Sequence, residues 1–446
     1  MTASEMVAGQ PENVDASAAP APPTVDSPSA NRSRPDGSDA PVRRQFPRWS
    51  EIRPLLSLKG ADSALPRGLR GAHTVSDVRA AARRAVPRPV FDFVDGGAED
   101  EVTMNRSRDA FRQIEFMPRA LTGIEAVDTS VTMLGRTASL PLVLAPTGFA
   151  RLSHRTGEIG AARAAGAAGV PYTLSTFGTI SIEELAAAAP DTDLWFQLYV
   201  LRDRELTASL VRRAFDAGYS TLVVTVDSVA TGKRVRDLRN GLSIPPKLTP
   251  KTVTTFAAKP RWALDMVTSP QLDLASLRSG SGKDLWTYLR ELADPTFSYA
   301  DIPTLRELWP GSLVLKGVLT VDDARAALDH GVDGIVLSNH GGRQLDRIPI
   351  GIELLPQVLD AVGDALEVYV DGGVRSGADL VAARGLGATG SLAGRPYLYG
   401  LMAAGQRGVQ HVLDIYAREA ELTLKLVGSR NMHGVTKELV RMRAGS

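Results

Sequence analysis

The chain has 446 residues, of which 43% are hydrophobic, and a formal net charge of +1. A chain of this length can bury a complete core, as one large domain or as two to three smaller ones. Because a net charge near zero gives no one-signed field to attract nucleic acid, we expect no nucleic-acid partner. The sequence contains no cysteine, which excludes disulfides, thiolate catalysis and iron–sulfur clusters.

The first 45 residues are rich in Ala, Pro, Ser, Asp and Gly, as in ASAAPAPPTVDSPSANRSRPDGSDAP. Such a segment buries too little apolar surface to offset the entropy of ordering it. We therefore expect residues 1–45 to be a disordered tail and residues 46–446 to form the folded domain. Order is expected to begin near Trp49, and a helix is predicted over Val75–Ala85, with Ser76 and Asp77 as candidate caps.

The sequence shows neither a membrane span nor a secretion signal. No apolar run approaches the ~18–20 residues that cross a bilayer, and the first residues lack the basic-then-apolar pattern of a signal peptide. We therefore expect a cytoplasmic protein, with peripheral contact at the inner face of the cell membrane as the open alternative.

A repeating pattern of apolar, β-rich runs and Ala-rich amphipathic segments follows the predicted first helix. The predicted strands are Leu140–Ala145, Val170–Ser175, Leu194–Val200, Thr221–Asp227, Leu313–Gly317, Gly334–Ser338, Leu366–Asp371 and Thr389–Gly394. The predicted helices between them are Gly157–Ala168, Ile182–Ala188, Arg204–Ala217, Val321–His330, Ile352–Val362 and Gly377–Gly385. Eight buried strands separated by helices indicate an α/β fold, a closed parallel (β/α)8 TIM barrel preceded by a helical segment. A doubly wound open sheet is the competing fold, but no dinucleotide-type glycine fingerprint follows the first strand.

A long insertion follows the fourth predicted strand, over about residues 240–300. Long loops in compact domains are usually functional or disordered, so we expect either a lid over the site or a surface contact. Its apolar residues lie beside Lys259 and Arg261, a mixture suited to a membrane or to a quinone-linked partner. These apolar residues are Trp262, Leu264, Met266 and Val267. A lid packed on its own barrel is the alternative.

Polar residues gather at the carboxyl ends of the predicted strands, where barrel enzymes carry their chemistry. In chain order, the ends offer Pro146 and Thr147, Ser175, Gln197 and Tyr199, Thr225 and Asp227, Lys316, Ser338 and His340, Asp371 to Gly373, and Gly394 with Arg395. Ser175, Gln197 and Thr225 can hydrogen-bond the edge of a flat heteroaromatic ring, and Lys316 can balance negative charge on it. Each residue alone is more often a helix cap or a solvated end, but their convergence favours a cofactor site.

Two further groups of residues suggest a phosphate site and a carboxylate site. Gly372, Gly373 and Arg375, with Gly394 and Arg395, follow the last two strands, where barrels often hold a phosphate. The remaining group is Tyr199, Asp227, Arg234, His340 and Arg343. Two arginines beside a histidine suit a substrate that bears a carboxylate and loses a proton, with aspartate orienting the imidazole.

The motifs resemble those of the FMN-dependent α-hydroxy-acid dehydrogenase and oxidase family, and among its members most closely the bacterial L-lactate dehydrogenases. SNHGGRQLD, from Ser338 to Asp346, matches the active-site signature of this family. Supporting stretches are GGAEDE, APTGF, FQLYV, LVVTVD, LVLKG, DGGVRSGAD and GRPYLYGL, and the resemblance runs from about Ala72 to Glu438.

The resemblance implies FMN as the cofactor and a small L-2-hydroxy acid, foremost L-lactate, as the substrate. The implied cofactor-binding residues are Pro146, Thr147, Ser175, Gln197, Thr225, Lys316, Ser338, Asp371, Gly372, Gly373, Arg375, Gly394 and Arg395. It implies that Arg343 binds the substrate carboxylate with Arg234 and Tyr199, that His340 is the base, and that Asp227 supports it. It also implies a homotetramer and no metal, and leaves a quinone, a cytochrome or oxygen as the electron acceptor.

Several residues depart from the family pattern. Phe93 replaces a tyrosine that helps to hold the substrate carboxylate, and Phe177 stands where many members have a tryptophan near the substrate. The last predicted strand is small and weakly β-forming, and Arg384 interrupts an otherwise apolar helix, which questions how firmly the barrel closes. The alternatives are therefore a related FMN enzyme for a bulkier or peptide-derived substrate, or a flavin-binding protein without turnover.

Overall fold

The computed structural model describes residues 48–53, 65–241, 250–270, 272–277 and 293–443. The predicted tail, residues 1–45, lies outside the described residues, so the boundary of the folded domain stays a prediction. Contacts divide the chain into two units, Met1–Lys59 and Gly60–Ser446. The first unit contributes one described helix, α1 (Trp49–Ile52), and the second contains the barrel.

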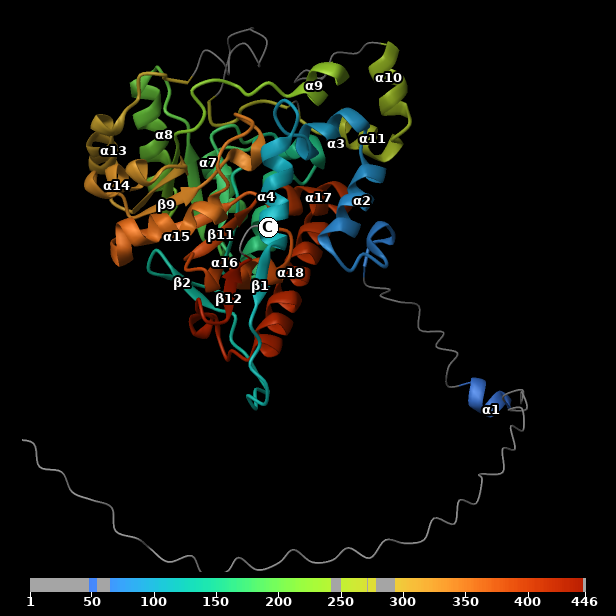
Figure 1. Ribbon diagram of the computed structural model, residues 1–446. Helices are drawn as coiled ribbons and strands as arrows, with labels where there is room; N and C mark the ends of the chain where they lie inside the picture. The colour runs from blue at the N-terminus through green and yellow to red at the C-terminus, as the bar shows by residue number, and fades with distance from the viewer. Residues whose placement is uncertain (1–47, 54–64, 242–249, 271, 278–292, 444–446) are drawn as a thin grey trace, which may run out of the picture. The chain divides into compact units, whose positions relative to one another are not determined.

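The second unit is built on a closed barrel of eight parallel strands (Figure 1). In barrel order, these strands are β10 (Glu367–Asp371), β11 (Gly390–Ala393), β4 (Leu142–Leu144), β5 (Tyr172–Ser175), β6 (Leu194–Leu198), β7 (Thr221–Thr225), β8 (Ser312–Val318) and β9 (Gly334–Leu337). The barrel prediction is confirmed, and each predicted strand ends within two residues of the observed one. Most residues in these strands are fully buried. This is expected because helices cover the outer face of the barrel and side chains fill its interior.

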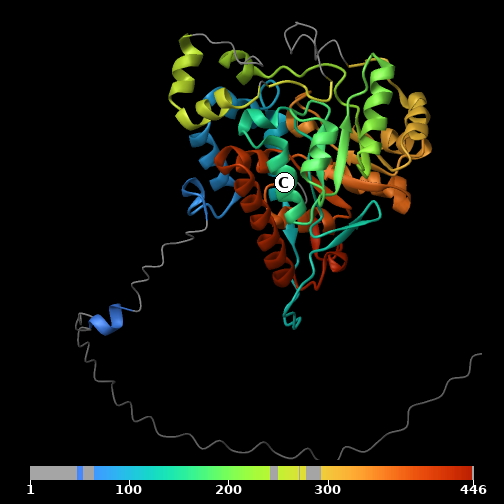
Figure 2. The ribbon, with the colours of Figure 1, turned by 180° about the vertical axis from the view of Figure 1, so that it is seen from behind.

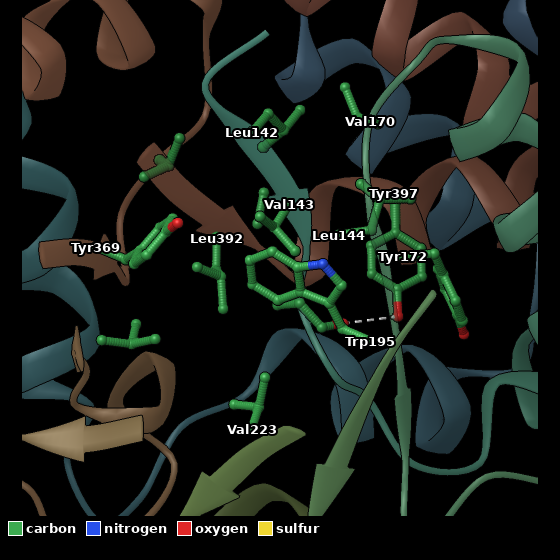
Figure 3. Packing of buried hydrophobic residues seen from close by; sticks show 14 of the residues in the cluster. Leu142, Val143, Leu144, Val170, Tyr172, Trp195, Val223, Tyr369, Leu392 and Tyr397 are labelled. Atoms are coloured by element: carbon green, nitrogen blue, oxygen red, sulfur yellow. Dashed lines mark hydrogen bonds between the residues drawn. The ribbon is translucent and has the colours of Figure 1, made fainter. Parts of the chain in front are cut away.

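The small last strand nevertheless closes the barrel. β11 pairs with β10 and with β4, where Tyr369 lies opposite Gly390 and Leu392 lies opposite Val143. Large side chains from other strands fill the interior, and the rings of Trp195 and Tyr369 meet edge to face at 6.0 Å (Figure 3). The small residues of β11 are therefore matched by large neighbours, and the doubt about closure is resolved.

The predicted helices are all present, and each agrees with the observed helix to within one residue at both ends. The described helices of this unit are α2 (Val75–Ala85), α3 (Arg88–Asp95), α4 (Val102–Arg112), α5 (Ala150–Ser153), α6 (Gly157–Ala167), α7 (Ile182–Ala188), α8 (Arg204–Asp216), α9 (Val235–Asn240), α10 (Pro250–Ala257), α11 (Pro260–Thr268), α13 (Ile302–Leu308), α14 (Val321–Asp329), α15 (Gly351–Val362), α16 (Gly377–Gly385), α17 (Arg395–Ala404) and α18 (Gln406–Val427). The N-cap of α2 is Thr74, which forms a capping box with Asp77, so Ser76 as a cap was wrong. Arg384 does not break α16, because its guanidinium donates to the carbonyl of Ala388 just beyond the helix end.

Two pairs of strands outside the barrel were not predicted. β2 (Val131–Met133) and β3 (Arg136–Ala138) form a hairpin, and β1 (Ile114–Phe116) pairs with β12 (Val440–Met442). The hairpin lies at the amino-terminal end of the barrel, because the backbone N–H of Leu134 in its turn donates to Glu367 at the start of β10. These three-residue strands carry too little periodicity to be predicted from the sequence.

The insertion after β7 contributes α9, α10 and α11, which lie with α3 at one end of the barrel in both views (Figures 1 and 2). Trp262 of α11 is only 6% exposed, and its Nε1 donates to the carbonyl of Leu152 at 2.9 Å. The prediction that Trp262 belongs to an outward-facing contact surface was therefore wrong, because the indole anchors α11 to the barrel. No helix among the described residues is long and apolar enough to cross a membrane.

Candidate active site

A cleft opens where the barrel strands end, and most of the predicted site residues line it. The predicted residues in its wall are Phe93, Pro146, Thr147, Ser175, Phe177, Tyr199, Thr225, Arg234, Lys316, His340, Arg343, Asp371, Gly372, Gly373, Arg375, Gly394 and Arg395. Gln197, Asp227 and Ser338 lie behind this wall, each hydrogen-bonded to a residue that lines it. The strand-end argument therefore placed the cleft, and Asp227 and Ser338 act on it through their neighbours.

A histidine and an aspartate form the first polar pair of the cleft. The Nδ1 of His340 lies 2.9 Å from Oδ1 of Asp227, which leaves Nε2 as the ring atom that can accept a proton. Burial lowers the pKa of His340 below its usual 6.5, although Asp227 acts in the opposite direction. Burial alone would raise the pKa of Asp227, but His340, Lys316 and Ser228 together lower it to about 2. At neutral pH the pair is a neutral imidazole hydrogen-bonded to a charged carboxylate.

A second polar group joins three consecutive strands. Lys316 of β8 donates to Ser338 at the end of β9 at 2.8 Å, and Ser338 donates to Oδ2 of Asp371 in β10 at 2.7 Å. The ammonium of Lys316 also lies 3.1 Å from Oδ2 of Asp371. Burial would lower the pKa of Lys316, but Asp371 and Asp227 raise it, so the lysine is charged. Register between neighbouring strands therefore fixes this cation in the floor of the cleft.

Two half-buried arginines hold the carboxyl end of α3 at the cleft. Nη1 of Arg343 donates to the carbonyls of Phe93 at 2.7 Å and Gly96 at 3.0 Å. Arg395 donates to the carbonyls of Val94 at 3.1 Å and Gly96 at 2.7 Å. Cations are favourable at a helix carboxyl end, where carbonyls have no intrahelical partners. Burial, with the nearby Arg234 and Arg395, lowers the pKa of Arg343, and an anion beside it would relieve this repulsion.

The third arginine of the cleft is less engaged. Arg234 stands at the N-cap of α9, and its Nε is buried with no hydrogen-bond partner among the described residues. The rings of Phe177 and Tyr199, which also line the cleft, stack at 4.7 Å. The guanidinium of Arg343 lies over the ring of Phe93, 5.4 Å from its centre. This part of the cleft therefore combines cationic groups with three aromatic rings.

The residues fit a flat, hydrogen-bonding cofactor such as FMN. Gln197 Nε2, Thr225 Oγ1 and Asp371 Oδ1 are buried polar atoms that have no partner within the described part of the chain. Buried polar atoms are normally satisfied, so three orphans around one cleft indicate a ligand with complementary donors and acceptors. Pro146 and Thr147 line the same cleft.

The phosphate end of the cleft is built from backbone more than from arginine side chains. Gly372 and Gly373 have φ values of 78° and 99°, which favour glycine. The guanidinium of Arg395 is used on the carbonyls of α3 and Gly341, so its side chain is directed at protein oxygens. Its backbone N–H begins α17, whose first turn leaves donors without intrahelical acceptors. The backbone N–H of Arg375 donates to Asp379, but its guanidinium lies over the ring of Tyr399 and makes no hydrogen bond among the described residues, so this guanidinium is available to a phosphate.

Sequence reasoning missed a cluster of charges that fixes α3. Asp95, at the end of α3, accepts bonds from Arg79 at 2.6 Å, Arg236 at 2.9 Å and the hydroxyl of Tyr399 at 2.7 Å. Burial would raise the pKa of Asp95, but these partners lower it. These residues come from four separate helices, so no local sequence pattern could have revealed the cluster. The motif VDGG, which contains Asp95, drew attention to this segment but not to its partners.

Known proteins resemble this chain along most of its length. The family model of the FMN-dependent dehydrogenases matches residues 82–442 of the chain. A Mycobacterium tuberculosis protein whose name gives it provisionally as an L-lactate dehydrogenase is 48% identical over 388 residues, covering 87% of this chain and 94% of that protein. The L-lactate dehydrogenase of Caulobacter vibrioides (strain NA1000 / CB15N) is 43% identical over 376 residues, covering 83% of this chain and 98% of that protein.

A solved structure is also similar. The crystal structure of the monotopic membrane protein (S)-mandelate dehydrogenase superposes with a TM-score of 0.80 at 38% identity, covering 83% of this chain and 99% of that chain. The family match includes every strand of the barrel, from β4 to β11. The chain therefore belongs to the FMN-dependent dehydrogenase family and is an FMN-dependent oxidoreductase of L-2-hydroxy acids.

Proposed function

We propose that the chain oxidises L-lactate to pyruvate, with His340 as the base. The observation that carries this proposal is the His340–Asp227 pair, which faces the same cleft as Arg343 and Arg234. Its neutral imidazole takes the hydroxyl proton of the substrate at Nε2, and Asp227 stabilises the imidazolium that forms. Arg343 and Arg234 bind and orient the carboxylate. FMN, when bound, supplies the two-electron acceptor for this oxidation.

FMN would be held across the strand ends. Lys316 would stabilise negative charge on the ring, and the unpartnered atoms of Gln197 and Thr225 would bond its polar edge. Asp371 would accept a bond from the sugar chain, and Gly373, Gly394 and the Arg375 side chain would hold the phosphate. The orphaned polar atoms support this arrangement, because each would gain a partner.

A second candidate substrate is an aromatic L-2-hydroxy acid such as L-mandelate. Phe93, Phe177 and Tyr199 line the cleft and would bury an aryl group, whereas lactate has only a methyl group to place there. The (S)-mandelate dehydrogenase structure, at 38% identity, also supports this candidate. The more similar sequences carry the name L-lactate dehydrogenase, which favours lactate.

Anaerobic mixing of the purified flavoprotein with each acid tests the proposal. We expect L-lactate to bleach the FMN absorbance and D-lactate to leave it unchanged. Faster bleaching by L-mandelate at lower concentration would replace lactate by the aromatic acid. Absence of bleaching with every L-2-hydroxy acid would contradict turnover altogether and favour a flavin-binding protein.

We also propose that the outer face of α11 makes peripheral contact with a membrane. Leu264 and Val267 are 63% and 84% exposed on this helix, on the side away from Trp262, and Arg261 is exposed beside them. Apolar side chains flanked by cations suit the interface of an anionic bilayer. The similarity to a monotopic membrane protein supports the idea.

Liposome flotation tests the membrane contact. We expect the wild-type protein to float with vesicles that contain anionic lipid, and Leu264→Ser with Val267→Ser to reduce the floated fraction. The matched control is Leu422→Ser with Leu426→Ser, which removes two leucines that are 57% and 66% exposed on α18. Equal recovery of all three proteins would contradict a contact through α11.

The homotetramer implied by the family resemblance stays a prediction. Light scattering at micromolar concentration measures the mass of the assembly directly, and a monomer would contradict the homotetramer.

Reoxidation of the reduced protein by oxygen, a quinone or a cytochrome, each added separately, identifies the electron acceptor.

A further inference from the structure

Gln344 connects the loop that carries His340 to the segment that follows β7. Its Nε2 donates to the hydroxyl of Ser228 at 2.7 Å and to the carbonyl of Ala230 at 3.2 Å. Its Oε1 accepts the backbone N–H of Gly232 at 3.1 Å. A carbonyl on one side and an N–H on the other fix which way the amide faces, so every polar atom of this side chain is used.

Ser228 continues this connection to the catalytic pair. Its hydroxyl accepts from Gln344 and donates to Oδ1 of Asp227 at 2.9 Å. The same oxygen of Asp227 lies 2.9 Å from Nδ1 of His340. Three hydrogen bonds therefore connect Gln344 to His340 through Ser228 and Asp227. Gln344 and His340 belong to one loop, and Ser228 and Asp227 belong to another.

The two segments also fit closely along their backbones. A Cβ atom at Gly232 would lie 2.3 Å from the carbonyl oxygens of both Arg343 and Gln344. Two residues further on, Arg234 is the N-cap of α9, and its buried Nε has no partner among the described residues. The segment held by Gln344 thus has Asp227 at one end and Arg234 at the other.

We propose that Ser228 and Gln344 are positioning residues for the oxidation: Ser228 orients Asp227 beneath His340, and Gln344 sets the segment from Asp227 to Arg234 against the loop of His340 and Arg343. This inference rests on the proposed function. Because Ser228 donates to the carboxylate of Asp227, its loss affects the proton transfer. Because Gln344 bonds the segment at Ser228, Ala230 and Gly232, between Asp227 and Arg234, its loss affects the proton transfer and the binding of the substrate carboxylate.

A simple packing role for the two side chains makes different predictions. Loss of packing would lower the melting temperature and would change the rate and the binding in parallel. It would also not require a hydroxyl, so the hydroxyl that Ser228→Thr keeps would not restore the rate that Ser228→Ala loses. Ser228 borders two neighbouring cavities, so the extra methyl group of threonine has room there.

The experiment compares Ser228→Ala, Ser228→Thr, Gln344→Met and the Ala/Met double variant with wild type, all loaded with FMN. Stopped-flow mixing with saturating L-lactate without oxygen gives the reduction rate, and the absorbance change on adding pyruvate gives a dissociation constant that requires no turnover. The matched control is Gln410→Met, because Gln410 also donates to a side chain, Asp414, but lies on the exposed face of α18.

We expect the FMN of Ser228→Ala to be reduced by L-lactate about tenfold more slowly than that of wild type, the loss expected for one hydrogen bond to a charged group. Its affinity for pyruvate should stay within about twofold of the wild-type value. Ser228→Thr should restore the rate. Gln344→Met should lower the rate and also weaken pyruvate binding by about tenfold. The double variant should be no slower than Gln344→Met, because both changes act on the rate through the same carboxylate.

Two results would overturn the inference: unchanged rate and affinity in Ser228→Ala and Gln344→Met, or effects on the rate that add fully in the double variant. Failure of the proposed function has a different signature, since wild type itself would then not be reduced by L-lactate or L-mandelate. In that case pyruvate and benzoylformate binding to Gln344→Met still decides whether Gln344 sets the carboxylate site.

Discussion

The cofactor half and the substrate half of the cleft are held in different ways. In the cofactor half, Lys316, Ser338 and Asp371 come from three neighbouring strands and bond one another, so barrel register sets their positions. In the substrate half, Phe93 comes from α3 and Arg234 from the start of α9, and tertiary contacts hold both elements. Residues of the substrate half can therefore be substituted without moving the residues that bind the cofactor. Phe93 and Phe177, which depart from the family pattern, are two such substitutions.

The largest expected effect comes from His340→Gln, which removes the base and keeps a side chain of similar reach. We expect the rate of FMN reduction by L-lactate to fall by about 10²–10⁴ or more, the usual value of a general base. FMN content should stay at the wild-type level, because the cofactor half does not depend on this ring. Stopped-flow absorbance measures both quantities, and reduction near the wild-type rate would contradict the assignment of His340.

Lys316→Met tests the cofactor half in the same way. Removing one partner of a buried ion pair costs about 3–5 kcal/mol, since the charge of Asp371 is left uncompensated. We expect a lower free energy of unfolding in denaturant and less FMN per chain after purification. Adding Asp371→Asn should recover part of the stability, because the isolated charge is then removed as well. Full FMN content and unchanged stability in Lys316→Met would show that register alone holds this half.

The dependence of kcat/KM on pH reports the base in the substrate half. Burial lowers the pKa of His340 below 6.5, so the imidazole stays neutral and active to lower pH than a free histidine. The rate should be constant above that pKa and fall about tenfold per pH unit below it. Asp227 raises the pKa of His340, and Lys316 and Arg234 lower it, so Asp227→Asn should move the fall to still lower pH. A fall that begins above pH 7 would contradict a buried, neutral base.

The same contrast explains what could be predicted from the sequence. The strands and their polar ends were predictable, because buried β-rich runs recur along the chain and the barrel brings their carboxyl ends together. Asp95 and Gln344 were not assigned a role, since their partners lie up to about 300 residues away in the chain, as Tyr399 does from Asp95. Trp262 was predicted to be exposed because apolar residues next to cations in the sequence look the same whether the helix is anchored to the protein or faces outward. In the structure its indole is anchored to Leu152.

The smallest effect, and the one that most directly probes the substrate half, is expected from Phe93→Tyr. The ring of Phe93 lines the cleft and lies beside Arg343, so a hydroxyl added to it can donate to a carboxylate held by that arginine. One hydrogen bond to a charged group contributes about 1.5–3 kcal/mol, which should lower the KM for L-lactate by about tenfold or more. The limiting rate should change little, since His340 and Asp227 are untouched, and FMN content should not change at all.

Phe177→Tyr is the matched control for Phe93→Tyr, because it adds the same hydroxyl to another ring of the cleft, one that stacks on Tyr199. If only Phe93→Tyr lowers the KM for L-lactate, the site is a lactate site weakened at one contact. If the KM is unchanged or raised, Phe93 contributes apolar surface that lactate does not use, and the assay should be repeated with L-mandelate. A higher KM for L-mandelate in Phe93→Tyr would then show that this half of the cleft is fitted to the aromatic acid.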